Sequence, residues 1–228
     1  MNFKSIVESF TGSTNIGYYM IHLPRSTERI PVINELQYKL NASIPLFDAA
    51  DGVELVKAGH PQRCGHSIGT VASRSPGDIG CTVSHVNIAR DCLAKGYEYA
   101  VVFEDDCEFN KTLEELSTIL DIAKGNQWDL FLLGASAYLD HKPINNSLST
   151  VKSFYGTHSL IMNKTFMENL ICIYTSACEK GLVYAADGLY SIVCKETDIK
   201  AVGFRGHNLY FKQRAGMYSY ILNRVRDH

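Results

Sequence analysis

The sequence has 228 residues, a formal net charge of -2, and 46% hydrophobic against 20% charged residues. This composition predicts one soluble globular domain rather than a disordered or fibrous chain. No run of basic residues is present, so the sequence offers no electrostatic basis for nucleic-acid binding. No apolar stretch approaches the roughly 18 residues that a transmembrane helix needs, and the N-terminus does not resemble a signal peptide. We therefore expect a cytoplasmic protein without a transmembrane segment.

The N-terminal part predicts a strand, a helix and a second strand. Residues 17–23 form an apolar run that a proline ends, and Ser26 or Thr27 can cap a helix over 28–40. A short strand follows at 44–47. Because strand–helix–strand crossovers within one sheet are parallel and right-handed, we expect these two strands to be parallel.

A glycine-rich segment, residues 59–80, leads into the best-defined helix. A connection of this length within a compact domain is usually functional or mobile. It ends in Ser75-Pro76-Gly77-Asp78, which combines a serine cap, a proline at the first helical position and an acid three residues after the cap. The helix ends at Gly96 and carries an apolar stripe that consists of Ile79, Val83, Val86, Ala89 and Leu93.

A buried strand follows at once and ends in three adjacent carboxylates, Glu104, Asp105 and Asp106. The apolar run 99–103 is typical of a parallel α/β sheet, in which ligands bind beyond the carboxyl ends of the strands. Three adjacent negative charges repel one another, so the site calls for a compensating cation. A divalent metal that carries a nucleotide's phosphates would supply it, because hard cations prefer carboxylate and phosphate oxygens. The alternative is an exposed acidic turn after a core strand.

The rest of the sequence continues the alternation of strands and helices. The predicted elements are a helix capped by Asn110, a strand at 128–134, a polar loop at 138–149, strands at 154–155 and 159–162, a helix over 165–178, a helix from a turn at 186–188 to about 194, and a strand-like run at 199–204. No internal repeat or low-complexity linker is present. These elements predict a single α/β domain with a mixed sheet.

The seven cysteines are an odd number and include no Cys-x-x-Cys pair. Zinc fingers use paired cysteines at short spacing, and disulfide frameworks use even numbers of them. We therefore expect buried free thiols in a reducing compartment.

Five segments, in the same order along the chain, resemble glycosyltransferase family 25, the lipopolysaccharide-type and collagen-type sugar transferases. They are MIHLPRSTER (20–29), AADG (49–52), GDIGCTVSH (77–85), VFEDD (102–106) and GTHSLI (156–161). The third and fourth segments are the most specific, and the resemblance covers roughly residues 17–165. The small size and the missing targeting signal resemble the bacterial or large-DNA-virus (chlorella-virus-like) members. A viral member would work in the host cytoplasm.

The resemblance implies a GT-A fold, with a Rossmann-like nucleotide-sugar-binding half over 17–135, an acceptor-side half over 136–228, and helices on both faces of a mixed central sheet. It implies a glycosyltransferase of the hexosyltransferase type that moves a sugar from a nucleotide-diphosphate donor, with a UDP-sugar expected first, to a glycan or other hydroxyl acceptor. The cofactor would be Mn²⁺ or Mg²⁺. In this fold Asp106 would bind the metal, Glu104 would assist, and Asp105 would contact the nucleotide. His207 is the ligand type available near the C-terminus to complete the metal shell.

Further donor-side candidates follow the first two strands. Leu23, Pro24, Arg25 and Arg29 come after the first strand, where an arginine would meet the base or the pyrophosphate of the donor. The structural alternative is a solvated helix start. Asp51 would bind uracil or ribose, although Asp-Gly is also an ordinary turn.

The remaining candidates come from helices and from the segment before a late strand. Ser84 and His85 lie off the apolar stripe of their helix and are expected near the donor, or as structural residues. His158 would line the acceptor side or hydrogen-bond a backbone group. Inverting transfer needs a general base for the acceptor hydroxyl, and Asp187, at a helix start, is the candidate; an aspartate there is also a favourable cap.

Two other functional classes stay open at this point. A sugar-nucleotide pyrophosphorylase would share the sheet and an acidic metal site, but it needs a glycine-rich loop after the first strand, which residues 23–26 lack. A non-catalytic carbohydrate-binding protein is the second alternative. The sequence leaves the donor sugar, the acceptor and the oligomeric state open.

Overall fold

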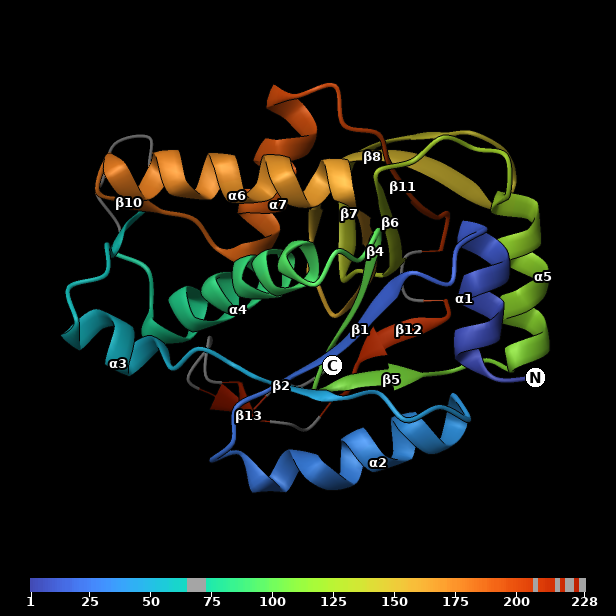
Figure 1. The fold of residues 1–228 in the computed structure, drawn as a ribbon, viewed down its shortest axis with the longest axis horizontal. Coiled ribbons are helices and arrows are strands. Elements are labelled where there is room, and N and C mark those ends of the chain that lie inside the picture. Colours follow the sequence, from blue (N-terminus) through green and yellow to red (C-terminus); the bar gives the residue numbers. More distant parts are fainter. Residues whose placement is uncertain (65–72, 207–208, 216–217, 220–223, 226–228) are drawn as a thin grey trace.

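The computed structural model describes residues 1–64, 73–206, 209–215, 218–219 and 224–225 (Figure 1). The helices are α1 (Phe3–Thr11), α2 (Ile30–Lys39), α3 (Gly52–Lys57), α4 (Pro76–Ala94), α5 (Leu113–Ala123), α6 (Lys164–Glu179) and α7 (Ala186–Glu196). The strands are β1 (Ile16–His22), β2 (Leu46–Asp48), β3 (Arg63–Cys64), β4 (Tyr99–Glu104), β5 (Cys107–Phe109), β6 (Leu130–Gly134), β7 (Ala137–Pro143), β8 (Leu148–Tyr155), β9 (Ser159–Asn163), β10 (Leu182–Val183), β11 (Ala201–Phe204), β12 (Phe211–Gln213), β13 (Tyr218–Ser219) and β14 (Arg224–Val225). Among the helices of these ranges, none has the length and apolarity that crossing a bilayer requires.

Eight strands form one mixed sheet in the order β2-β1-β4-β9-β6-β11-β8-β7. β1 is parallel to β2, as predicted, and also to β4. β9 runs antiparallel between β4 and β6. The chain therefore passes from β1 to β2 on one side of it and then to β4 on the other side, so the strand order reverses at β1. The carboxyl ends of β1, β2 and β4 and the start of β9 meet at one edge, which is where open α/β sheets bind ligands.

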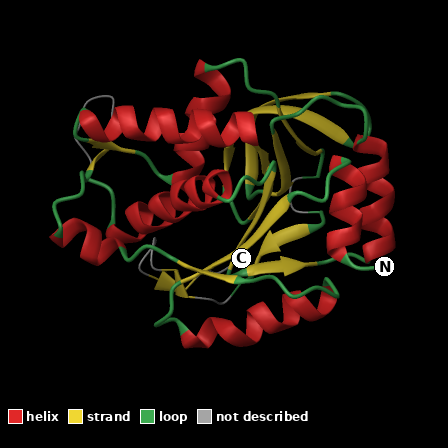
Figure 2. Ribbon diagram, in the orientation of Figure 1, coloured by secondary structure: helices red, strands yellow, loops and turns green. Residues whose placement is uncertain are grey.

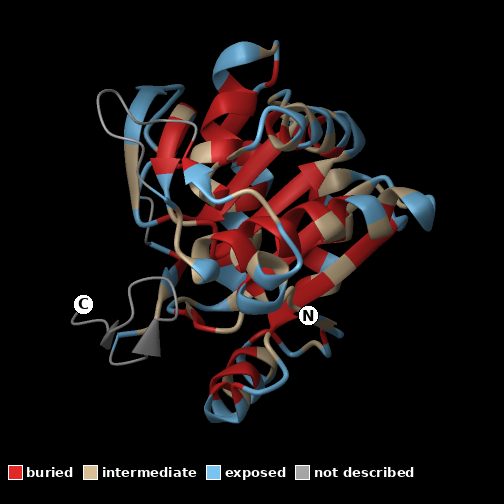
Figure 3. Cartoon of the chain, turned by 90° about the vertical axis from the view of Figure 1, so that its left-hand side faces the viewer, coloured by how far each residue is buried: buried red, intermediate tan, exposed pale blue. Residues whose placement is uncertain are grey.

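Successive residues of β4 enter two separate cores. Ala100 and Val102 belong to the core formed with α4, α6 and α7, whereas Val101 and Phe103 belong to the core formed with α1, α2 and α5. Figure 2 shows the helices on both sides of the sheet, and Figure 3 shows the buried strands between them. A strand covered on both faces is apolar throughout, which explains the continuous run at 99–103. The predicted α/β architecture with helices on both faces is confirmed.

α4 begins where the sequence predicts and supports the site. Ser75 Oγ accepts a hydrogen bond from the Asp78 N–H at 3.1 Å, and the Asp78 carboxylate accepts one from the Ser75 N–H at 3.3 Å. The helix is buried beyond its apolar stripe, since Ser84 and His85 are also buried. A Cβ atom at Gly80 would lie 2.6 Å from the Ala50 carbonyl oxygen, so glycine lets α4 approach the turn at 49–52 closely.

Two helix starts differ from the prediction. The helix assigned to a cap at Asn110 begins at Leu113, because Thr112 and Glu115 form a reciprocal capping box there. The helix expected from residue 28 begins with a 3-10 turn, Thr27–Arg29, and Ser26 makes no side-chain cap hydrogen bond. That turn places Arg29 in the interior, where it is buried.

Two regions differ in their secondary structure. The polar loop predicted at 138–149 is largely the β7–β8 hairpin, because β7 is an exposed edge strand and so lacks apolar alternation. α1 has no predicted counterpart, although its buried residues lie at helical spacing behind an Asn2 cap; they are Phe3, Ile6, Val7 and Phe10.

All seven cysteines are free thiols, as predicted, but the predicted burial is confirmed for four of them only. Cys64, Cys92, Cys107 and Cys194 are buried, and Cys172 on α6 is exposed. Cys81 is half-buried and lies at the site described below.

Candidate functional site

A cavity of about 520 Å³ lies beyond the carboxyl ends of β1 and β4. The lining residues that the sequence analysis singled out are Leu23, Arg25, Arg29, Asp51, Ser84, Glu104, Asp105 and Asp106. Ile21, Ser26, and apolar and small residues of the 49–53 turn and of the first half of α4 with its cap complete the described wall. A larger hollow of about 1020 Å³ lies at the opposite edge of the sheet, beside the starts of β4 and β6, and holds none of these candidates. The cavity at the carboxyl edge is therefore the candidate site.

The acidic triplet is compensated in part by the chain itself. Arg29 Nη1 lies 3.1 Å from Asp106 Oδ2 and 3.4 Å from Asp105 Oδ1, and its side chain is only 6% exposed. His22 Nδ1 lies 3.0 Å from Asp105 Oδ2. The alternative of an exposed acidic turn is wrong, because Asp106 is buried. Arg29, expected to bind the donor, therefore also holds two of the three acids in place.

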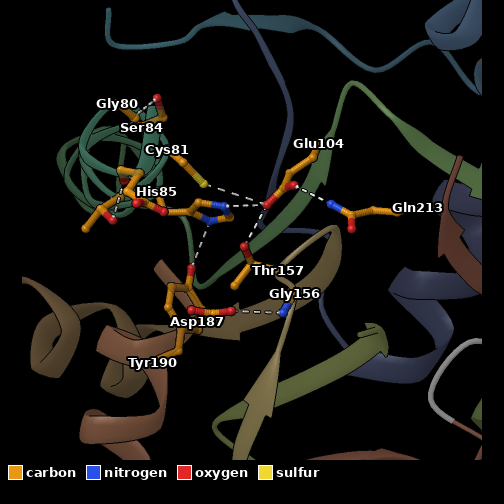
Figure 4. A network of polar contacts seen from close by, with 12 residues as sticks. Gly80, Cys81, Ser84, His85, Glu104, Gly156, Thr157, Asp187, Tyr190 and Gln213 are labelled. Carbon is orange, nitrogen blue, oxygen red and sulfur yellow. Dashed lines mark hydrogen bonds and ion pairs between the residues drawn. The ribbon is translucent and has the colours of Figure 1, made fainter. Parts of the chain in front are cut away.

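Glu104 is the centre of a polar network (Figure 4). Thr157 Oγ1 donates a hydrogen bond to Glu104 Oε1 at 2.6 Å, and His85 Nε2 lies 3.3 Å from the same oxygen. Gln213 Nε2 donates to Glu104 Oε2 at 3.5 Å. Burial favours the protonated carboxyl, but the hydrogen bonds and charge of His85, with Thr157, outweigh it and lower the pKa of Glu104. Glu104 is thus an ionised, tightly held carboxylate.

Arg25 and Asp51, which both line the cavity, form an ion pair. Asp51 also caps α3, because its Oδ1 accepts a hydrogen bond from the Val53 N–H at 2.9 Å. Both side chains line the cavity, and so does Leu23. Pro24 is exposed and is not among the described residues that line it.

Ser84 and His85 act through neighbouring residues. Ser84 Oγ accepts a hydrogen bond from the Ala50 N–H at 2.9 Å and donates one to the Gly80 carbonyl at 2.7 Å, which fixes the 49–52 turn against α4. His85 is 1% exposed and lies behind Glu104, where its Nδ1 is 3.1 Å from the Tyr190 hydroxyl.

Asp187 lies in the first turn of α7, beside this network (Figure 4). Its Oδ2 accepts a hydrogen bond from the Gly156 N–H at 3.2 Å, and its Oδ1 accepts one from the Gly188 N–H at 2.7 Å. Burial raises the pKa of Asp187, these two hydrogen bonds oppose the rise, and the charge of Glu104 adds to it. The helix cap is Ala185, so Asp187 is not held there as a capping residue.

The remaining candidates lie elsewhere. His158 is fully buried, and its Nε2 faces the Phe211 carbonyl oxygen at 3.4 Å, so it does not line the described cavity wall. His207 lies outside the described residues. A contact between either residue and a substrate or metal therefore stays a prediction.

The sequence did not predict several contacts of the triplet, although Thr157 lies in the GTHSLI segment. Thr157 lies 53 positions and Gln213 lies 109 positions from Glu104, and each reaches it only through strand pairing. β12 pairs with β5, the Arg214 N–H donates to the Asp106 carbonyl at 2.8 Å, and the Arg214 guanidinium contacts Glu35 at 2.6 Å. His22 could have been noted as a polar residue that ends an apolar strand.

Asp105 predicts a pH dependence of stability in the metal-free protein. Burial, opposed by Arg29 and reinforced by Asp106, raises the pKa of Asp105 from 3.8 to about 6. The folded chain therefore binds this proton more tightly than the unfolded chain, and the free energy of unfolding falls as pH rises between these two values. Asp105→Asn removes this fall. The melting temperature of the variant minus that of wild type should therefore increase as pH rises from 3.8 to about 6, and it should stay constant above that pH. Thermal unfolding in chelator, with the exposed Asp140→Asn as control, measures this. A difference that shrinks as pH rises contradicts it.

The family model described as "Glycosyltransferase family 25 (LPS biosynthesis protein)" matches residues 15–226. The chain belongs to glycosyltransferase family 25. This family-25 chain is 29% identical over 132 residues to "Inactive glycosyltransferase 25 family member 3" of Mus musculus. The match covers 51% of this chain and 21% of the mouse protein. It is 28% identical, also over 132 residues, to "Probable inactive glycosyltransferase 25 family member 3" of Rattus norvegicus. That match covers 51% of this chain and 22% of the rat protein. The chain thus spans about a fifth of the length of these curated relatives.

Two solved structures resemble the family-25 chain at low identity. A glycosyltransferase involved in the glycosylation of the major capsid of PBCV-1 has a TM-score of 0.43 and 12% identity, and covers 82% of this chain and 80% of its own. A197 from STIV has a TM-score of 0.46 and 13% identity, with coverages of 82% and 80%.

The triplet of this family-25 chain has the donor chemistry that a hard divalent cation prefers. Glu104, Asp105 and Asp106 all line the cavity and offer carboxylate oxygens only, the ligand type that Mn²⁺ and Mg²⁺ favour. Arg29 neutralises part of the charge and His22 Nδ1 lies 3.0 Å from Asp105, and the remaining acidic oxygens fit a cation.

Proposed function

We propose that this chain is a metal-dependent glycosyltransferase that moves a sugar from a nucleotide-diphosphate donor, a UDP-sugar in the first instance, to a hydroxyl acceptor with inversion. The observation that carries the proposal is the arrangement of the acidic triplet. It ends β4 at the strand-order reversal and lines a cavity together with Arg25 and Arg29. Membership of family 25 supports the same reaction class.

On this proposal, different residues contact the nucleoside and the diphosphate of the donor. Leu23, Arg25 and Asp51 contact the nucleoside end, and Arg29 faces the diphosphate while it holds Asp105 and Asp106. Asp106 holds the cation, with Glu104 beside it. When bound, Mn²⁺ or Mg²⁺ would neutralise the charge that develops on the departing diphosphate.

Asp187 is the proposed general base for the acceptor hydroxyl. A general base must accept a proton in the transition state, and burial, which raises the pKa of Asp187, makes its carboxylate more basic than an exposed one. Its backbone hydrogen bonds to Gly156 and Gly188 fix the orientation of the carboxylate.

The direct test is donor binding. Thermal unfolding and calorimetric titration with a panel of UDP-sugars, each with Mn²⁺ and with chelator, should show that one donor binds and stabilises the protein only when Mn²⁺ is present. If no nucleotide sugar of the panel, and neither UDP nor GDP, binds with Mn²⁺, the proposal is wrong.

The second candidate function is donor binding without transfer. Both curated relatives reported above carry names that call them inactive. Slow hydrolysis of the donor, with water in place of the acceptor, separates the candidates, since a transferase releases the nucleoside diphosphate over hours. Donor binding without any such release favours the second candidate.

A further inference from the structure

Cys81, His85 and Glu104 form a compact cluster at the back of the donor cavity (Figure 4). Within the part of the chain that the structure describes, they are the one group of three potential metal ligands whose donor atoms all lie within 4.8 Å of one another. Cys81 and His85 are four residues apart on α4 and so project from the same face of the helix. Glu104 reaches them from the end of β4.

Two distances in the cluster are close to those around a tetrahedral metal ion, and the third is within 4.8 Å. His85 Nε2 is 3.3 Å and Cys81 Sγ is 3.9 Å from Glu104 Oε1. A tetrahedral zinc ion, with bonds of about 2.0 Å to nitrogen and oxygen and about 2.3 Å to sulfur, separates its ligand atoms by roughly 3.3 to 3.6 Å. The three side chains would need only small adjustments to surround such an ion.

The contacts of His85 are compatible with the tautomer that a metal needs. The Tyr190 hydroxyl donates its proton to Met162 Sδ at 3.2 Å, so its oxygen is available to accept a hydrogen bond from His85 Nδ1–H at 3.1 Å. In that tautomer the lone pair of Nε2 points toward the Glu104 carboxylate, so a bound ion would replace the direct contact between His85 and Glu104.

We propose that Cys81, His85 and Glu104 bind a divalent ion of borderline softness, of which Zn²⁺ is the representative, with three protein ligands and a fourth position at the donor cavity. A thiolate and an imidazole select zinc-like ions over Mn²⁺ and Mg²⁺, which distinguishes this site from the oxygen-only site at Asp106. Cys81 and Glu104 both line the cavity, so the open position faces it. Binding releases the thiol proton, because the ligand is the thiolate.

The outer contacts resemble those that orient metal ligands. Tyr190 fixes one ring nitrogen of His85, and Thr157 donates to Glu104 at 2.6 Å. Loss of such outer contacts typically weakens metal binding about 10- to 100-fold, and loss of a ligand weakens it more.

The test uses the metal alone, without nucleotide. Chelator-treated protein is titrated with Co²⁺, whose thiolate complex absorbs in the near ultraviolet, and with Zn²⁺ in competition with a chromophoric chelator. Wild type and the exposed-cysteine control Cys172→Ser should bind one ion with the thiolate band. Cys81→Ser should lose the band and bind Zn²⁺ more than about 100-fold less tightly, and Tyr190→Phe about 10- to 100-fold less tightly.

A second measurement needs no variant. Zn²⁺ should protect Cys81, but not Cys172, from alkylation in the wild-type protein, as read by peptide mass spectrometry. Absence of the thiolate band in wild type, equal Zn²⁺ affinity of Cys81→Ser and wild type, or alkylation of Cys81 at the same rate with and without Zn²⁺ each overturns the proposal. Asp106→Asn should retain Zn²⁺ binding, so failure of the donor proposal is distinguishable from failure of this one.

Discussion

Asp106→Asn should weaken Mn²⁺-dependent donor binding by at least about 30-fold, which corresponds to about 2 kcal/mol or more. The amide keeps the shape of the side chain but removes the charge that holds the cation. It also leaves Asp105 as the charged member of the two carboxylates that Arg29 contacts. Calorimetric titration of the cognate UDP-sugar with Mn²⁺ measures the change.

The matched control for Asp106 is Asp121→Asn on the exposed face of α5, which removes the same charge away from the cavity. Its donor affinity should equal that of wild type. Circular dichroism establishes that both variants fold. A folded Asp106→Asn protein with unchanged Mn²⁺-dependent affinity contradicts the assignment of this residue.

Asp187→Asn should reduce the turnover rate by about 10²- to 10⁴-fold while the donor affinity stays unchanged. The amide cannot accept the acceptor's proton, and Asp187 is not among the described residues that line the donor cavity. Released nucleoside diphosphate gives the rate, and titration gives the affinity. Asp140→Asn, an exposed aspartate on β7, serves as the control.

The pH profile gives a second readout for Asp187. Because burial raises the pKa of this carboxyl, the acid limb of the wild-type rate should lie above the ordinary aspartate value of 3.8. This limb should vanish in Asp187→Asn, whose residual rate depends little on pH in that range. A variant that loses donor affinity and rate together would make Asp187 a donor-binding residue instead.

The sequence by itself determined the features that depend on neighbouring residues. The strand at 99–103 is apolar because it is buried on both faces, and the charges that end it mark the ligand edge of the sheet. The capping box of Ser75 and Asp78 also predicted the start of α4, because its two residues are only three positions apart in the sequence. The N-terminal residues carried an equally local pattern, the helical spacing of Phe3, Ile6, Val7 and Phe10, from which α1 could have been predicted.

Only the tertiary structure decided which charges surround the acidic triplet. His22 and Arg29 reach Asp105 from β1 and from the turn before α2, and Thr157 reaches Glu104 because β9 inserts antiparallel beside β4. The sequence predicted that the three acids need a cation and assigned a metal to that role. The structure adds Arg29, buried against Asp105 and Asp106, as a cation supplied by the chain. The strand order and the long-range pairing of strands determine these contacts. Neither can be predicted from local periodicity, caps or turn residues.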